Sequence, residues 1–147
     1  MFELHGQLAA DAALLGDLPL CRVLLAKDSH YPWLILVPRI ADVKEMHHLS
    51  PEQQQQLMKE SCAIAALMEL MLCPDKINIA ALGNVVPQLH IHHIARFMTD
   101  RAWPAPIWGA YPAEIYTERA LQDELNRWGE WLNKLDDFIP TPQATIC

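Results

Sequence analysis

The chain has 147 residues, of which 52% are hydrophobic and 20% are charged, so it can bury a real core and is not an intrinsically disordered protein. Its formal net charge of −7 argues against binding to a nucleic-acid polymer through a basic surface, although a small pocket can still bind a single nucleotide. The length predicts one domain, residues 1–147.

The N-terminal residues, the longest apolar run and the cysteine pattern bear on where the protein is located. The N-terminal residues do not read as a signal peptide, because no basic segment precedes an apolar run. The apolar run from Cys62 to Cys73 is too short to span a bilayer and is interrupted by Glu69. The four cysteines form no CxxC pair, so buried packing is the expected role of Cys21, Cys62, Cys73 and Cys147. We therefore expect a soluble cytoplasmic protein that is not associated with a membrane.

The first half of the chain predicts a helix, two strands and a second, longer helix. Residues Leu8 to Leu18 have the pattern of a short helix that ends at Pro19. A β-rich run begins at Cys21, and the nearly continuous apolar run from Trp33 to Arg39 is typical of a strand covered on both faces. A capping-box sequence begins at Ser50 and predicts the start of the long helix.

The second half predicts two more strands and a final helix. The strands are expected over Lys76 to Leu82 and over Gln88 to Phe97, on either side of a Gly-containing turn. After Pro112, apolar residues recur with helical spacing, at Leu121, Leu125, Trp128, Leu132 and Leu135. Short connections between strands favour antiparallel pairing, so this order predicts an α+β fold with a sheet packed by helices.

The segment "QLHIHHIAR" places unusual polarity in an expected inner strand. Alternation puts Gln88, His90 and His92 on one face, and His93 on the other. Burying such groups without partners costs about 1–3 kcal/mol each, so this face needs a compensating interaction. Three interpretations are open: core hydrogen bonding, a zinc site, or catalysis.

The alternatives differ in what else they require of the sequence. A zinc site needs further ligands, and no motif selects among the distant His30, His47 and His48. Nucleophilic catalysis needs an imidazole that attacks phosphorus, a neighbour that fixes its tautomer, and a turn whose N–H groups face the phosphate. The Gly83-Asn84 turn before the histidines provides such an element.

This segment, following "INIAALGNVVP", resembles the motif of the histidine triad (HIT) family of nucleotide hydrolases and transferases. It is most similar to a bacterial branch in which Gln replaces the first His. The resemblance extends to the strand "WLILVPR", the long helix and the segment "RFMTDRAWPAPIWG". It implies a HIT-like antiparallel sheet of about five strands with a long helix packed on it, a C-terminal helix, and a homodimer.

The resemblance also assigns roles to individual residues. It implies that His90 is the nucleophile, that His92 contacts the phosphate and supports the reaction, and that Gln88 occupies the first triad position. Gly83 and Asn84 fall on the pair that approaches the α-phosphate.

Further candidates lie outside the motif. Asp28 falls where the family contacts ribose, with Lys27 as the alternative, and Arg96 could meet a polyphosphate tail or be an ordinary solvated residue. Trp103 and Trp108 are candidates for a base-stacking wall, a dimer contact or plain packing. Tyr31 and Trp33 are candidates for lining the base pocket.

The function implied by the resemblance is attack on the α-phosphate of a nucleoside phosphate derivative, through a nucleotidyl-His90 intermediate. Diadenosine polyphosphates and nucleoside phosphoramidates are the expected substrate classes. No cofactor is required, although a divalent cation could accompany a polyphosphate. Gln88 cannot titrate as His does, and Val85 stands where many relatives carry a hydroxyl. These departures keep open a nucleotide-binding module with little or no turnover, and a zinc-binding structural protein is a third hypothesis.

Overall fold

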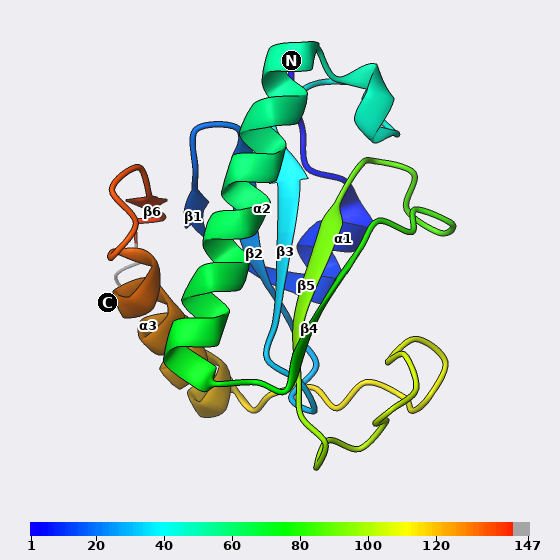
Figure 1. Ribbon diagram of the computed structural model, residues 1–147, viewed down its shortest axis with the longest axis vertical. Helices are drawn as coiled ribbons and strands as arrows, with labels where there is room; N and C mark the ends of the chain where they lie inside the picture. The colour runs from blue at the N-terminus through cyan, green and yellow to red at the C-terminus, as the bar shows by residue number, and fades with distance from the viewer. Residues whose placement is uncertain (143–147) are drawn as a thin grey trace.

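A six-stranded antiparallel sheet forms the centre of the computed structural model, which describes residues 1–142 (Figure 1). The strand order is β4-β5-β3-β2-β1-β6. The long helix α2 lies across one face, and α3 covers the β1 end of that layer (Figure 1). In chain order the elements are α1 (Gly6–Asp11), β1 (Ala12–Asp17), β2 (Cys21–Ala26), β3 (Trp33–Pro38), the 3-10 helix η1 (Met46–His48), α2 (Pro51–Leu72), β4 (Lys76–Ala80), β5 (Ile91–Arg96), α3 (Glu118–Leu132) and β6 (Ile139–Pro140). The predicted α+β fold is confirmed, with β6 as a short sixth strand.

The helix predicted over Leu8 to Leu18 is wrong beyond Asp11. From Ala12 the chain forms β1, which pairs with β2 from the Ala12–Ala26 pair onward. A short apolar run fits a buried strand as well as a helix, and the pairing with β2 decides between them. Gly16 also matters here, because a Cβ at this position would lie 2.6 Å from the Phe138 ring.

The predicted start of α2 is confirmed in atomic detail. The hydroxyl of Ser50 accepts a hydrogen bond from the N–H of Gln53 (3.2 Å), and the Gln53 side chain accepts one from the N–H of Ser50 (2.8 Å). Pro51 occupies the first turn, where its missing N–H costs nothing. The helix ends at Leu72, and the C-cap residue Cys73 adopts a left-handed conformation.

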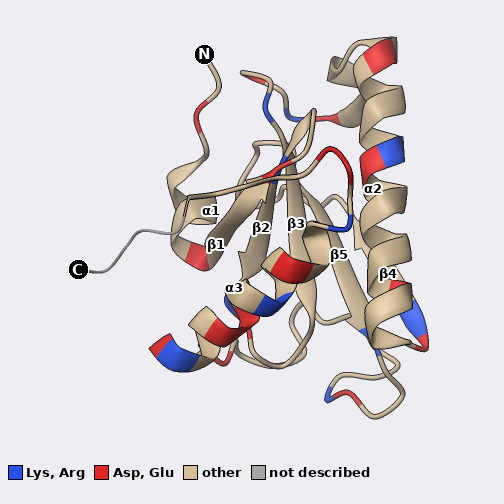
Figure 2. Ribbon diagram, turned by 90° about the vertical axis from the view of Figure 1, so that its left-hand side faces the viewer, with Lys and Arg blue, Asp and Glu red and all other residues tan. Residues whose placement is uncertain are grey.

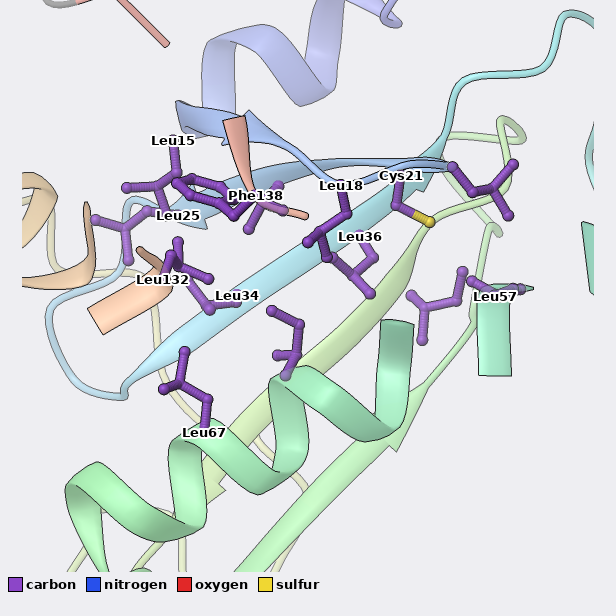
Figure 3. Close-up of a cluster of buried hydrophobic side chains, with 14 of the residues drawn as sticks. Leu15, Leu18, Cys21, Leu25, Leu34, Leu36, Leu57, Leu67, Leu132 and Phe138 are labelled. Atoms are coloured by element: carbon purple, nitrogen blue, oxygen red, sulfur yellow. The ribbon is translucent and has the colours of Figure 1, made fainter. Parts of the chain in front are cut away.

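Apolar side chains fill the space between the sheet and the two helices (Figure 3). Leu34 and Leu36 of β3 point into this layer, where Trp128 and Leu132 of α3 are fully buried. Because side chains alternate along a strand, Trp33 and Ile35 point to the opposite face of the sheet. The sheet therefore has one face for the core and another for a site.

A buried carboxylate links α2 to the start of β2. Glu60 accepts hydrogen bonds from the backbone N–H groups of Leu20 (2.9 Å) and Cys21 (2.8 Å) and from the Gln56 amide (2.7 Å). These donors compensate for removing the carboxylate from water. This contact sets the position of the helix along the sheet.

The outer surfaces carry the charges and two of the cysteines. Acidic and basic residues alternate along α3 (Figure 2). Cys21 is buried as expected, but Cys62 and Cys73 are exposed, because they lie on the outer face of α2 and just past its end. Cys147 lies outside the described residues. Within residues 1–142, no helix combines the length and apolarity needed to cross a bilayer.

Candidate active site

A cavity of about 610 Å³ opens on the sheet face opposite α2. Its walls come from α1, from the last residue of β2 and the two that follow it (26–28), from Trp33 and Ile35 of β3, and from the turn 82–86. Trp108, Ala113 and Ile115 close another side. His90 and His92 both line it, so the structure brings the two predicted catalytic histidines into one pocket.

Strand alternation separates the neighbouring histidines. His92 faces the pocket, whereas His93 is fully buried on the α2 side, where its Nε2 lies 2.7 Å from the Ser61 hydroxyl. The prediction that His93 points away from the site is therefore confirmed. The predicted strand bounds need correction, because β5 begins at Ile91 and leaves His90 and Gln88 in the preceding loop.

His90 is held by the backbone of its own loop. Its Nδ1 donates to the carbonyl oxygen of Gln88 (2.7 Å), since a carbonyl can only accept. In the neutral ring the lone pair is then on Nε2. Only 7% of His90 is exposed, so little of this ring is left to bulk water. The geometry provides a nucleophilic nitrogen of defined tautomer.

His92 has the complementary arrangement. Burial, reinforced by the charges of His90 and His93, lowers the pKa of His92 to about 3, so the ring is neutral at physiological pH. The indole N–H of Trp33 donates to Nδ1 of His92 (3.0 Å). Because indole is a donor only, Nδ1 must accept and Nε2 carries the proton. One ring thus offers a lone pair at Nε2 and the other an N–H donor.

Two tryptophans pack against His92. The ring centroids of Trp33 and Trp108 lie 5.5 and 5.2 Å from the His92 ring, and both tryptophans line the pocket. Trp103 packs instead over the guanidinium of Arg96. Of the two tryptophans in the Pro-rich segment, only Trp108 is brought to the site, whereas Tyr31 is buried beside Arg96.

Arg96 is not brought to the pocket, so its predicted contact with a polyphosphate is corrected. It is 1% exposed and binds Asp100 through two nitrogens at 2.8 and 3.1 Å. It also donates to Asn78 (2.9 Å) and to the carbonyl of Ala105 (2.8 Å). Arg96 ends β5 beyond the pocket, and its guanidinium holds the loop that follows the strand.

Asp28 lines the pocket and also binds a distant segment. Its Oδ1 accepts from the N–H groups of His30 (3.0 Å) and Glu114 (3.3 Å). The N–H of Ser29 donates to the carbonyl of Glu114 (2.7 Å), so the chain around Glu114 is fixed to the turn after β2. Ala113 and Ile115, which flank it, become pocket walls. Sequence reasoning missed both, because neither residue type carries a local functional signal.

The predicted phosphate turn also lies at the pocket. Gly83 has a φ of +75°, a conformation that a side chain would strain, and it lines the cavity together with Asn84. Val85 is exposed and Val86 is buried. Thus the turn that the motif pairs with the histidines lies beside them.

No metal-ligand cluster is found in the part of the chain that the structure describes. Across residues 1–142, no three His, Cys, Asp or Glu side chains are grouped so that they could hold a metal ion. His30 contacts Asp28 and Glu114, and His47 stacks on His48. The zinc hypothesis therefore finds no ligand set in this region.

Comparisons with known proteins agree with this geometry. The HIT domain family model matches residues 7–99, which is more than half of the chain. The chain belongs to the histidine triad family. A search of curated proteins found no match. Membership supports nucleotide binding and hydrolase activity in general terms.

Solved structures of histidine triad proteins resemble the whole described fold. One from Marinobacter aquaeolei VT8 is 47% identical, with a TM-score of 0.88, and the match covers 92% of this chain and 98% of that one. A second, from Bradyrhizobium japonicum, is 43% identical (TM-score 0.84; 90% and 96% covered). A third, from Sinorhizobium meliloti 1021, is 42% identical (TM-score 0.84; 88% and 96% covered).

Gln88, which the resemblance predicts for the first triad position, does not direct its side chain to His90. Its amide oxygen accepts from the N–H of His5 (2.9 Å), and its amide nitrogen donates to the carbonyl of Glu3 (2.8 Å). The Gln88 side chain is absent from the described lining of the pocket. The predicted placement of the Gln88 side chain beside the predicted catalytic histidines is therefore corrected, because the hydrogen bond between Gln88 and His90 involves the Gln88 backbone carbonyl.

Proposed function

We propose that this chain hydrolyses a nucleoside phosphate derivative at its α-phosphorus, through a nucleotidyl-His90 intermediate. The observation that carries the proposal is the pair of opposite tautomers in one pocket, a lone pair on Nε2 of His90 and an N–H on Nε2 of His92. A nucleophile and a hydrogen-bond donor side by side suit attack on a phosphoryl group whose oxygens carry the charge.

The reaction proceeds in two displacements. Nε2 of His90 attacks phosphorus, and the bond to the leaving group breaks, with the leaving group taking the electron pair and a proton from solvent. The Nδ1–H bond to the Gln88 carbonyl stabilises the charge that the His90 ring then carries. Water attacks phosphorus next and loses a proton to solvent, the electron pair of the P–N bond returns to Nε2 of His90, and a nucleoside monophosphate is released.

The remaining pocket residues bind the substrate. The N–H groups near Asn84 and the Nε2–H of His92 stabilise the phosphoryl oxygens, and the carboxylate of Asp28 accepts from ribose hydroxyls. Trp33, Trp108 and the apolar walls provide the surface for the base.

The charge of the pocket favours one of the two substrate classes. Among its described lining residues, Lys27 is the only ammonium or guanidinium group, and the same lining contains the carboxylates of Asp11 and Asp28. The ammonium of Lys27 also donates to the carbonyl of Ala10 (3.3 Å). A polyphosphate leaving group brings several negative charges into a pocket that already contains two carboxylates, whereas the amine of a phosphoramidate brings none. We therefore place nucleoside phosphoramidates first, and expect diadenosine polyphosphates to need a divalent cation.

We further propose that the protein is a homodimer and is located in the cytoplasm. The free edge of the sheet at β4 and the outer face of α2 expose Ile79, Met58 and Leu70, each at least half exposed, which supports pairing with a second copy through this side. Light scattering of the purified chain tests the stoichiometry. A monomer at all concentrations would remove this part of the proposal.

The test of function is turnover of a substrate panel with the unaltered protein beside His90→Ala. Adenosine phosphoramidate, diadenosine polyphosphates with and without Mg²⁺, and aminoacyl adenylates are followed by chromatography of the released monophosphate. His47→Ala, which removes an exposed imidazole away from the pocket, is the matched control. Release that disappears in His90→Ala and persists in His47→Ala is the expected result, with adenosine monophosphate still bound by both variants. Turnover unchanged in His90→Ala would refute the mechanism.

A second candidate is a nucleotide-binding module with little turnover. Val85 offers no hydroxyl beside the leaving group, and the Gln88 side chain is occupied elsewhere. Tight binding of adenosine monophosphate without release of product from any substrate would favour this candidate.

A further inference from the structure

We propose that Gln88 is a positioning residue that holds the N-terminal segment, residues 1–11, as a wall of the nucleotide pocket. This role replaces any part in proton transfer at the first triad position. The proposal rests on the proposed function for the identity of the ligand, a nucleotide, and not for the existence of turnover.

The oxygen and the nitrogen of the Gln88 side-chain amide both form hydrogen bonds with the backbone of the N-terminal segment. The oxygen accepts from the N–H of His5 and the nitrogen donates to the carbonyl of Glu3, across 83 and 85 residues of sequence. A primary amide has an acceptor and a donor on adjacent atoms, so it can pair with both groups of an extended chain. A carboxylate of the same shape has no donor for the Glu3 carbonyl.

The anchored residue is the one from which α1 begins. His5 is the N-cap of α1, where its Nδ1 accepts from the N–H of Gln7 (3.1 Å) and its carbonyl accepts from the N–H of Ala9 (3.0 Å). A helix of six residues is not stable by itself in water. The position of α1 therefore depends on tertiary contacts: the buried Leu8, which packs with Ala12, Ile35 and Val86, and the clamp from Gln88.

The same short helix forms one side of the cavity. Gln7, Leu8, Ala10 and Asp11 all line the pocket, as do Gly83 and Asn84. Movement of α1 would open the pocket on this side. Proton transfer at His90 does not depend on the Gln88 side chain, because the carbonyl that orients His90 belongs to the backbone and is present whatever residue stands there.

Hydrogen exchange measures the clamp directly. Gln88→Ala removes both bonds, and the isosteric Gln88→Glu removes the donor and sets an oxygen against the Glu3 carbonyl. Losing both bonds, each taken at the low end of the net range because they are exposed, predicts about five-fold faster exchange in peptides covering residues 2–11, with β3 and β5 unchanged. Gln122→Ala is the control, because the Gln122 amide donates to the exposed Asn126 one turn away on α3, outside the N-terminal segment.

Adenosine monophosphate then links the clamp to the pocket. Saturating monophosphate should slow exchange of residues 6–11 in the unaltered protein and in both variants, and its Kd should rise by up to the same factor in the variants. With a turned-over substrate, KM should rise while kcat and the pH profile of kcat stay within about two-fold of the unaltered protein.

Three results would overturn the proposal: unchanged exchange at residues 2–11 in both Gln88 variants, no protection of residues 6–11 by adenosine monophosphate, or a fall in kcat at constant KM. The last would return Gln88 to proton transfer. Failure of the proposed hydrolysis looks different, because absence of turnover in the unaltered protein, with the exchange and binding results as expected, leaves the clamp intact.

Discussion

Replacing Trp33 with Phe tests whether the indole N–H determines the tautomer of His92. The substitution keeps an aromatic ring against His92 but removes the donor 3.0 Å from Nδ1. A neutral hydrogen bond contributes about 0.5–1.5 kcal/mol net, so the preference for the Nε2–H form should weaken about five-fold at the middle of that range. If the Nε2–H of His92 stabilises the phosphoryl oxygens, kcat/KM should fall with the population of the Nε2–H form, by at most about that factor.

The assay is nitrogen NMR of the histidine-labelled protein together with steady-state kinetics. In the unaltered protein the His92 nitrogens should show an accepting Nδ1 and a protonated Nε2, because Trp33 can only donate. In Trp33→Phe the two nitrogen shifts should move toward each other. The nitrogen shifts are measured independently of activity, so they separate a change of the His92 tautomer from a loss of packing.

Trp108→Phe is the matched control. Its ring lies 5.2 Å from that of His92, and no hydrogen bond from its indole to His92 is found among the described contacts. Both variants lose apolar contact and should be less stable, but only Trp33→Phe should change the His92 nitrogens. Unchanged nitrogen shifts and unchanged kcat/KM in Trp33→Phe would refute the assignment of the His92 tautomer to Trp33.

Two further predictions concern stability. Burial lowers the pKa of His92 to about 3 and of His93 to about 4. The unfolded chain therefore binds more protons than the folded one from about pH 6.5 down to those values, and stability is fully present above about pH 6.5. Urea unfolding should show a loss of up to about 1.4 kcal/mol per pH unit for each group as the pH falls through this window, and a flat profile between pH 6.5 and 4.5 would contradict the burial of neutral rings. Glu60→Gln sets an amide donor toward the N–H of Leu20 or Cys21. The free energy of unfolding in urea should fall by about 1–3 kcal/mol, with activity per folded molecule unchanged. A loss below about 0.5 kcal/mol would show that this buried carboxylate is not needed to link α2 to β2.

Local chemistry explains which elements were predictable. The capping box at Ser50 and the apolar run from Trp33 are complete within a few residues, and both appear as expected. The alternation of His92 and His93 about the sheet follows from strand geometry alone. For β1 the local pattern was ambiguous, because the same residues fit a helix until β2 pairs with them.

In the candidate site too, contacts between residues close in sequence were predictable, and contacts between distant residues were not. The motif predicted that His90, His92 and the Gly83 turn lie together, since they are close in sequence, and all three line the pocket. It could not place Arg96, whose guanidinium finds Asp100, Asn78 and the Ala105 carbonyl once the following loop folds back.

By itself the sequence determined the order of the strands and helices from β2 to α3, the triad-like motif and the opposite faces of His92 and His93, because spacing along one strand or one helix turn defines these features. The tertiary structure alone decided that Trp33 donates to His92, that Gln88 binds the N-terminal segment, and that Ala113 and Ile115 line the pocket. Each of these contacts joins residues far apart in the chain. Their energies depend on burial and hydrogen-bond geometry that exist only after the sheet has formed.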